Sequence, residues 1–227
     1  MTPYTNPTPV SRVPLSRDRV LHAAIRLADE GGIESLTMRR LGRALDVEAM
    51  SLYKHVANKD DVLDGIVDLV EGEIELPSSA EGWAAAVRTC AISAHEVLRR
   101  HPWACSLIIS RFRPARLRYM DWLLGRLRGA GFSPQLTYHA YHALDSHILG
   151  FTLWEAGHSV DTEDLATFLQ ELPADDYPHF AEHVQQHLTE PGHHDVGGFE
   201  FQLDLILDGL QRLRDSTCPG CPSKGLY

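Results

Sequence analysis

The polar side chains between Val47 and Leu63 have the chemistry of a surface that contacts nucleic acid. The segment VEAMSLYKHVANKDDVL holds one tyrosine, two lysines and a histidine within a few residues, followed by a run of carboxylates. Lysine, histidine and tyrosine can donate hydrogen bonds to phosphate oxygens, and a helix that presents them can enter the major groove of DNA. The side chains expected to face DNA are Thr37, Met38, Arg39, Glu48, Ala49, Met50, Ser51, Tyr53, Lys54, His55 and Lys59. The same spacing also fits a helical hairpin with a solvated charged face.

The charge of the chain is divided at the same place. The net charge is −10, but residues 1–59 carry nine Lys and Arg against six Asp and Glu, or +3, and residues 60–227 carry twelve against twenty-five, or −13. Such an asymmetry indicates a segment adapted to a polyanion joined to one that is not, with chance clustering as the alternative.

A second group of residues could bind a metal ion. Three histidines are spaced four residues apart: His179, His183 and His187. Two imidazoles at this spacing can share a zinc ion, but a catalytic site needs a third ligand and usually a glutamate base. Cys218 and Cys221 form only half of a zinc or redox site, and His193, His194 and Asp195 lie between Gly-containing turns that could close over a ligand. We expect no catalytic residue, metal or cofactor; a helical metal-dependent enzyme that uses these His-rich segments is the alternative.

Aromatic and histidine side chains are concentrated between residues 101 and 154. A largely apolar pocket with a few polar groups is typical of a small-molecule site, although most members of such a cluster also suit a core or an interface. The residues expected to contact a ligand are Trp103, Leu107, Phe112, Trp122, His139, His142 and Phe151.

The elements that must position these side chains are all expected to be helices. Apolar residues recur at helical spacing along most of the chain, and no run of alternating strand residues is convincing. The expected helices run from Ser16 to Gly31, Thr37 to Leu45, Glu48 to His55, Asn58 to Leu76, Ala80 to Arg100, Pro102 to Ser110, Arg116 to Ala130, Pro134 to Ala156, Asp175 to Leu188 and Phe199 to Arg214. The sequence therefore predicts an all-α protein.

The first three helices fit a helix-turn-helix domain, in which the second helix of the pair enters the DNA major groove. Leu41, Leu45 and Leu52 are expected to pack the pair on the first helix, with Asp46 at the turn. The pattern predicts a mobile arm over 1–15, a DNA-binding domain over 16–60, a helical ligand-binding and dimerisation domain over 61–215 and a tail over 216–227. The connecting helix is expected over 58–76, ended by Pro77.

The run LTMRRLGRALDVEAMSLYKHVANKDDVLDGIVD resembles the N-terminal domain of tetracycline-repressor (TetR) type transcriptional regulators. The resemblance rests on SLTMRRLGRAL, on LYKHV at the end of the recognition helix and on NKDDVLD at the start of the connecting helix. Asp46 departs from the glycine that is usual at the turn. The resemblance implies a dimeric repressor that a small ligand releases from a double-stranded DNA operator.

The C-terminal part resembles the regulatory domain of the tetracycline-repressor branch through RHPWA, RGAGFSPQLTYHAYHALDSHILGF, YPHFAEH and FEFQLDLILDGLQRL. Glu75 and Leu107 stand where that branch has the histidines that hold the drug and its metal ion. Because a leucine cannot coordinate a cation, we do not carry this metal–tetracycline site over to the chain. We expect an apolar or aromatic effector instead.

Two helices are apolar on more than one face: the one that begins at Pro134 and the last one. A helix that is apolar nearly all round must be buried on both sides, either in the core of a monomer or partly against a partner subunit. The resemblance favours a homodimer that pairs these helices in a four-helix interface. The interface residues expected are Leu144, Ile148, Leu203, Leu207 and Leu210. The N-terminus has Pro and Thr where a secretory signal has an apolar block, and no apolar run could span a bilayer, so we expect a cytoplasmic protein.

Overall fold

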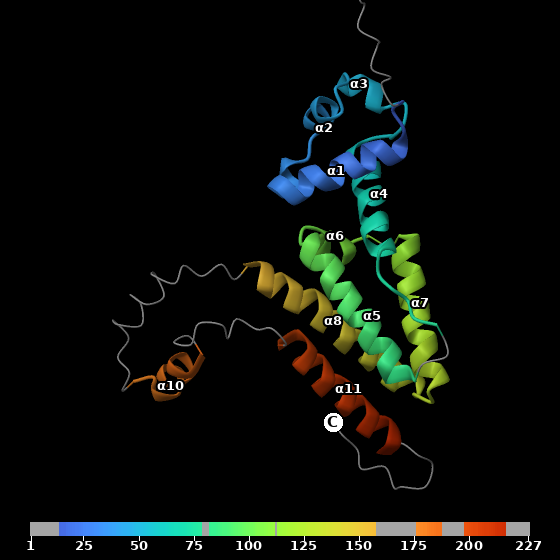
Figure 1. Cartoon of the computed structure of the whole chain (residues 1–227). Helices are drawn as coiled ribbons and strands as arrows, with labels where there is room; N and C mark the ends of the chain where they lie inside the picture. Colours follow the sequence, from blue (N-terminus) through green and yellow to red (C-terminus); the bar gives the residue numbers. More distant parts are fainter. Residues whose placement is uncertain (1–13, 79–81, 112, 158–175, 188–197, 217–227) are drawn as a thin grey trace, which may run out of the picture. The chain divides into compact units, whose positions relative to one another are not determined.

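The computed structural model describes residues 14–78, 82–111, 113–157, 176–187 and 198–216, and every regular element in these ranges is helical. The all-α prediction is therefore confirmed. The chain divides into two compact units, the first ending at Val67 and the second beginning at Asp68 (Figure 1). None of the described helices has the length and apolar character that crossing a membrane requires.

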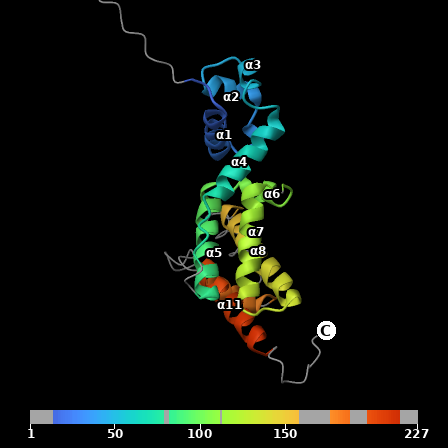
Figure 2. The same cartoon turned by 90° about the vertical axis from the view of Figure 1, so that its right-hand side faces the viewer.

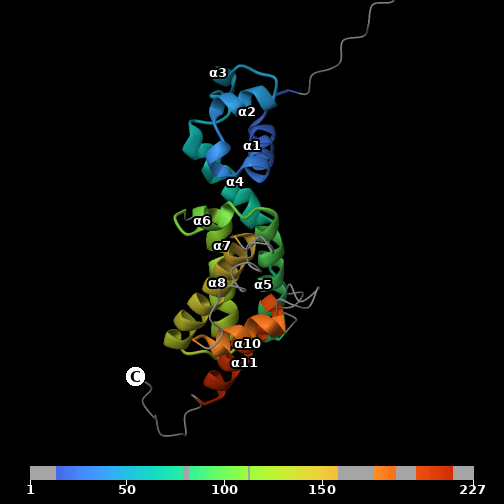
Figure 3. The ribbon, with the colours of Figure 1, turned by 90° about the vertical axis from the view of Figure 1, so that its left-hand side faces the viewer.

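The first unit is built from short helices around one longer helix (Figure 3). Its elements are α1 (Arg17–Gly31), the 3₁₀ turn η1 (Ile33–Ser35), α2 (Met38–Ala44), α3 (Ala49–Leu52) and the first part of α4 (Lys59–Gly72). The division between the units falls inside α4, whereas the sequence placed the domain boundary at residue 60. The start of α4 belongs with the first unit because Gly65 lies directly against the side chain of Leu21 on α1.

The ends of α1 follow from its capping residues. Ser16 begins the helix, and its Oγ accepts a hydrogen bond from the backbone N–H of Arg19 at 3.2 Å. Gly32 ends the helix with φ 72°, in the left-handed region that glycine adopts readily, and its N–H donates to the carbonyl of Ala28. Between these caps, Val20 and Ala24 lie on the buried face, as the spacing predicts.

Several helices are shorter than their sequence patterns predict, among them the third helix and the connecting helix. The third helix ends at Leu52 instead of His55, because the next residues close i to i+3 bonds, with the His55 N–H donating to the Leu52 carbonyl at 2.8 Å. The connecting helix α4 ends at Gly72 instead of Leu76, and the N–H of Glu73 donates to the carbonyl of Val70 in the same tightened geometry. Both stops come from hydrogen bonding at the helix end, which apolar spacing does not encode.

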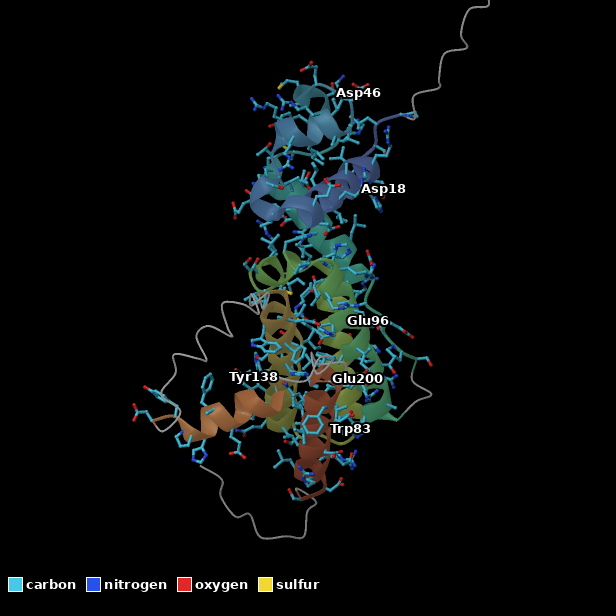
Figure 4. The ribbon with its side chains drawn as sticks, turned by 60° about the vertical axis from the view of Figure 1, so that its left-hand side comes forward. Asp18, Asp46, Trp83, Glu96, Tyr138 and Glu200 are labelled. Carbon is cyan, nitrogen blue, oxygen red and sulfur yellow. The ribbon has the colours of Figure 1, made fainter. Side chains whose placement is uncertain are left out.

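The second unit is a helical bundle. Its elements are the end of α4, α5 (Trp83–Arg100), α6 (Ala104–Ile108), α7 (Pro114–Gly129), α8 (Pro134–Gly157), α10 (Pro178–His187) and α11 (Gly198–Ser216). Helix α8 packs against α5, α7 and α11 (Figure 2). At one end of the bundle the Trp83 indole donates to Gln211 on α11 at 3.1 Å and meets the Phe132 ring edge-on (Figure 4). The bundle provides the apolar interior in which a ligand site can form.

Candidate nucleic-acid interface and ligand cavity

The helix pair α2–α3 is held by a cap and by a tight turn. Thr37 begins α2, and its Oγ1 accepts from the Arg40 N–H at 3.2 Å, as the sequence predicts. Asp46, labelled in Figure 4, has φ 55° at the turn, a left-handed conformation that aspartate tolerates better than most residues. The Val47 N–H closes the turn by donating to the Gly42 carbonyl at 2.9 Å. These bonds fix the direction of α3, which is too short to hold its own orientation.

The predicted DNA-contacting side chains all lie at least partly on the surface of the first unit. Thr37, Arg39, Glu48, Met50, Tyr53, Lys54 and Lys59 are exposed, while Met38, Ala49, Ser51 and His55 are half-buried. Leu52 points the other way and is fully buried. The surface is therefore open to a partner, and the DNA-contacting role of each side chain stays a prediction.

An ion pair that the sequence analysis missed connects the start of α1 to the start of α4, next to the loop that follows α3. Arg17 donates from both terminal nitrogens to the Asp61 carboxylate, at 2.7 and 2.9 Å. The same carboxylate accepts from the Ala57 N–H, and the Asp61 N–H donates to Oδ1 of Asn58, the residue before α4, each at 2.8 Å. The Asn-x-x-Asp spacing at 58–61 is the sequence signal for such a cap. The network fixes the loop between the predicted recognition helix and α4.

A narrow space of about 170 Å³ lies inside the second unit, between α5, α7 and α8. It is too narrow to admit water. The lining residues are Val87, Cys90, Ala91, Tyr119, Trp122, Leu123, Leu144 and Ile148. Burial raises the pKa of Cys90 to about 12, so its thiol stays protonated and unreactive. A ligand could use this space only if the helices moved apart.

A second and more open cavity, of about 420 Å³ and wide enough for water, lies on α8 and α11. It is lined by Ser146, His147, Gly150, Phe151, Trp154 and Gln202. This volume is in the range of small-molecule sites, and the lining combines aromatic faces with a few polar groups.

Behind this cavity, the ring of Phe199 is stacked between two imidazoles. The ring centroids are 4.1 Å apart for His95 and Phe199 and 4.7 Å for His147 and Phe199, with nearly parallel planes. His147 Nε2 is 3.0 Å from the Phe199 carbonyl, which can only accept, so Nε2 carries the proton and Nδ1 is an acceptor. Burial lowers the pKa of both histidines, which keeps them neutral at pH 7.

The structure does not bring the seven predicted ligand residues together. Phe151 lines the α8–α11 cavity, and Trp122 lines the narrow space and donates to the Pro77 carbonyl at 3.1 Å. Trp103 is buried and Leu107 half-buried at α6, whereas His139 and His142 are exposed on α8. Phe112 lies outside the described residues. His147 and Trp154, which sequence reasoning did not select, are the additional aromatic lining of the cavity.

The five predicted interface residues are buried inside a single protomer. Leu144, Ile148, Leu203, Leu207 and Leu210 are each at most 6% exposed. They lie on the inward stripes of α8 and α11, so as placed here they cannot reach a partner. The outward faces carry other apolar side chains: Tyr138, Leu153 and Trp154 on α8, and Phe201, Leu205 and Leu213 on α11.

The described residues contain no group of three His, Cys, Asp or Glu side chains that could hold a metal ion. His179 and His183 are exposed on α10. The side chain of His187, the segment 193–195 and the two tail cysteines lie outside the residues that the structure describes. The hypothesis of a metal-dependent enzyme therefore gains no support from the described residues.

Comparison with known proteins matches both units to one family. Residues 20–66 match the family model "Bacterial regulatory proteins, tetR family", and residues 76–214 match "Tetracyclin repressor-like, C-terminal domain". An HTH-type transcriptional regulator of Saccharopolyspora erythraea is 34% identical over 175 residues, which cover 74% of each chain. The HTH-type transcriptional repressor DrrR1 of Streptomyces coeruleorubidus is 30% identical over 215 residues, covering 88% of this chain and 78% of the relative.

A solved structure has the same fold. The TetR family protein ActR of Streptomyces coelicolor, in complex with actinorhodin, superposes with a TM-score of 0.72. The two proteins are 27% identical, and the match covers 89% of this chain and 99% of ActR.

Proposed function

The chain belongs to the TetR family of bacterial transcriptional regulators, and from this premise we propose that it is a homodimeric repressor released from its operator by an aromatic effector. The observation that carries the proposal is the α2–α3 pair, whose cap and turn hold an exposed polar and basic surface on one side and bury Leu52 on the other. Such a protein acts where its DNA is, so we place it in the cytoplasm.

The test of DNA binding begins with a duplex selected from a random pool by the protein itself. Two recognition helices related by a two-fold axis require half-sites about 34–36 Å apart or a multiple of it. If Lys54 and Lys59 contact phosphate, Lys54→Ala and Lys59→Ala each weaken binding and lower the salt slope by about one. Arg99→Ala, which removes an exposed cation from α5, is the control and leaves the slope unchanged. Equal affinity of the double lysine variant and the wild type would refute this assignment of α3.

The proposed dimer interface is the outward apolar face of α8 and α11. Leu205 is 56% exposed there, and Leu117 on α7 is 53% exposed on a different helix, so the two leucines form a matched pair. A charge buried at the interface is strongly unfavourable, so Leu205→Glu is expected to dissociate the dimer, whereas Leu117→Glu leaves it intact. Sedimentation at micromolar concentration measures whether each variant is a monomer or a dimer. A wild-type chain that sediments as a folded monomer would contradict the proposal.

We propose that the effector binds in the α8–α11 cavity. Phe151 and Trp154 offer aromatic surface, and His147 Nδ1 offers an acceptor suited to a phenolic hydroxyl. Actinorhodin, the ligand in the similar ActR structure, is the first compound to test. Binding is expected to quench tryptophan fluorescence and weaken operator binding, and Trp154→Ala is expected to blunt both responses. Because Trp154 also lies on the proposed dimer face, the variant is compared with the wild type only after sedimentation shows that it remains a dimer. If compounds that bind this cavity leave the affinity for DNA unchanged, the proposal that this cavity controls release from the operator is wrong. The assignment of the DNA-binding surface would not be affected.

A further inference from the structure

The C-terminal end of α4, which belongs to the second unit, carries two carboxylates that face the bundle. Asp68 Oδ1 accepts from the Ala115 N–H at 2.8 Å, in the first turn of α7, where a negative charge is favourable. Glu71, three residues later, is only 3% exposed. The end of α4 is therefore fixed to the bundle by acidic side chains.

Glu71 competes with another carboxylate for a single cation. The Arg116 guanidinium on α7 donates through Nη2 to Asp145 Oδ2 at 2.6 Å and to the Tyr141 hydroxyl at 3.0 Å, both on α8. Its Nη1 is 3.8 Å from Glu71 Oε1, a longer and weaker approach. Arg116 also lies over the Tyr119 ring, 5.2 Å from its centroid. Asp145 is thus the close partner of the guanidinium, and Glu71 the distant one.

The Glu71 carboxylate lacks hydrogen-bond donors for one of its oxygens. Glu71 Oε2 is buried and has no hydrogen-bond partner among the described residues. An ionised carboxylate in this position loses its hydration without a matching donor, and two negative charges then share one guanidinium. Uptake of a proton removes the surplus charge. The geometry therefore favours a neutral Glu71 in this arrangement of the helices.

We propose that Glu71 is a proton-dependent latch on α4: the neutral side chain holds the end of the helix against α7 and α8, and ionisation favours a different helix arrangement. This inference rests on the proposed function, because α4 runs from the DNA-binding unit into this cluster. A ligand or proton can change operator affinity only by binding the two arrangements unequally. Glu71 meets this requirement if its carboxyl becomes hydrated in the second arrangement.

The electrostatics agree with the geometry. The pKa of Glu71 is raised from 4.5 to about 7, mainly by burial; Arg116 lowers it, and Asp145 and Asp68 raise it. The titratable and charged groups around Glu71 are Asp68 on α4, Arg116 and Tyr119 on α7, and Tyr141 and Asp145 on α8. A hydrated glutamate returns to its ordinary pKa near 4.3, so the second arrangement is increasingly favoured as the pH rises from about 4.3 to about 7, and the effect levels off above 7.

The experiment measures the affinity of the full chain for the selected duplex between pH 6 and 8 at constant ionic strength. The quantity to follow is the affinity ratio of wild type and Glu71→Gln, because this ratio cancels the pH dependence that other groups contribute to both proteins. This affinity ratio is expected to change by about threefold or more between pH 6 and 8. The titration of one proton can change it by at most about tenfold per pH unit. Glu73→Gln removes a charge two residues along, at an exposed pair with Arg100, and is the matched control. It is expected to keep the wild-type pH dependence.

A second variant separates titration from a merely structural role. Asp145→Asn leaves Arg116 free to pair with Glu71, which lowers the pKa of Glu71 and moves the midpoint of the pH dependence to lower pH. Carboxyl ¹³C NMR of the glutamate-labelled chain reads the same titration directly, with the Glu71 signal identified by its loss in Glu71→Gln.

The outcomes distinguish the latch from the function on which it rests. A ratio that changes with pH, with a midpoint that Asp145→Asn lowers, supports the latch. If wild type and Glu71→Gln bind the selected duplex with the same pH dependence, the latch is overturned and the proposed function is not. A Glu71 carboxyl signal that titrates near 4.3 has the same consequence. Failure to select any duplex overturns the proposed function, and the latch with it.

Discussion

Gly42→Ala is expected to damage the DNA-binding unit through a collision with backbone atoms. Gly42 is buried in α2, and a methyl group built on it would lie 2.8 Å from the Val47 carbonyl oxygen. It would also lie 3.2 Å from the Ala49 nitrogen and 3.3 Å from the Ala49 Cα. These atoms belong to the turn and to the start of α3, so the methyl group can be accommodated only if the predicted recognition helix moves.

The size of the effect follows from two opposing contributions. Alanine favours the helix over glycine by about 0.8–1.0 kcal/mol. Overpacking a rigid contact costs about 1–3 kcal/mol. The expected net loss is about 1 kcal/mol in the free energy of unfolding, measured by urea denaturation. Affinity for the selected duplex, measured by fluorescence anisotropy, is expected to fall further, because displacement of α3 misplaces every side chain that it carries.

Gly65→Ala is the matched control. A methyl group there would meet only the ends of flexible side chains: Leu21 Cδ2 at 2.7 Å, Leu21 Cδ1 at 2.8 Å and Arg17 Nη2 at 3.3 Å. Such side chains can rotate away where a peptide group cannot. This variant is expected to keep its operator affinity. Unchanged stability and unchanged affinity in Gly42→Ala would refute the reasoning that the close backbone approach at Gly42 sets the position of α3.

Two further predictions concern the second unit. Gly125 is exposed in α7 and a methyl group there meets nothing within 4 Å, so Gly125→Ala is expected to raise the free energy of unfolding by up to about 1 kcal/mol, read in urea. His147 has a lowered pKa in the folded chain, so its contribution to stability is present above its unfolded pKa of about 6.5 and is lost as the pH falls below that value. Thermal unfolding at pH 7.5 and 5.5 is expected to show a larger loss for the wild type than for His147→Gln, and equal losses would contradict the neutral, buried imidazole.

The existence of the helices and the starts of α1, α2 and α4 could be predicted from the sequence because their causes are local. Thr37 and Asn58 cap the helices that follow them, and Asp46 takes the left-handed turn, since each of these residues acts on a backbone group at most three positions away. The family motifs added the function, because they extend over many positions in register.

The orientation of α8 could not be predicted in the same way. Leu144 points into the protomer and Leu153 to the surface, although both are leucines on a helix that is apolar on most sides. Periodicity selects a buried face only when the opposite face is polar.

The buried cluster around Glu71 could not be predicted for a different reason. Its members, Glu71, Arg116 and Asp145, lie on three helices far apart in the sequence, and each charge taken singly indicates an exposed residue. The same holds for the stacked rings of His95, His147 and Phe199, which only the packing of three helices brings together.

The shortness of α3 has a consequence for how operator preference can evolve. Among Ala49, Met50, Ser51 and Leu52, only Leu52 is buried, and the direction of the helix is set by the turn and by α2. The other three side chains contribute little to the fold, so mutations can exchange them at small cost in stability. A gene duplicate could therefore acquire a new DNA target by changing a few surface residues while keeping its scaffold, its subunit pairing and its response to ligand.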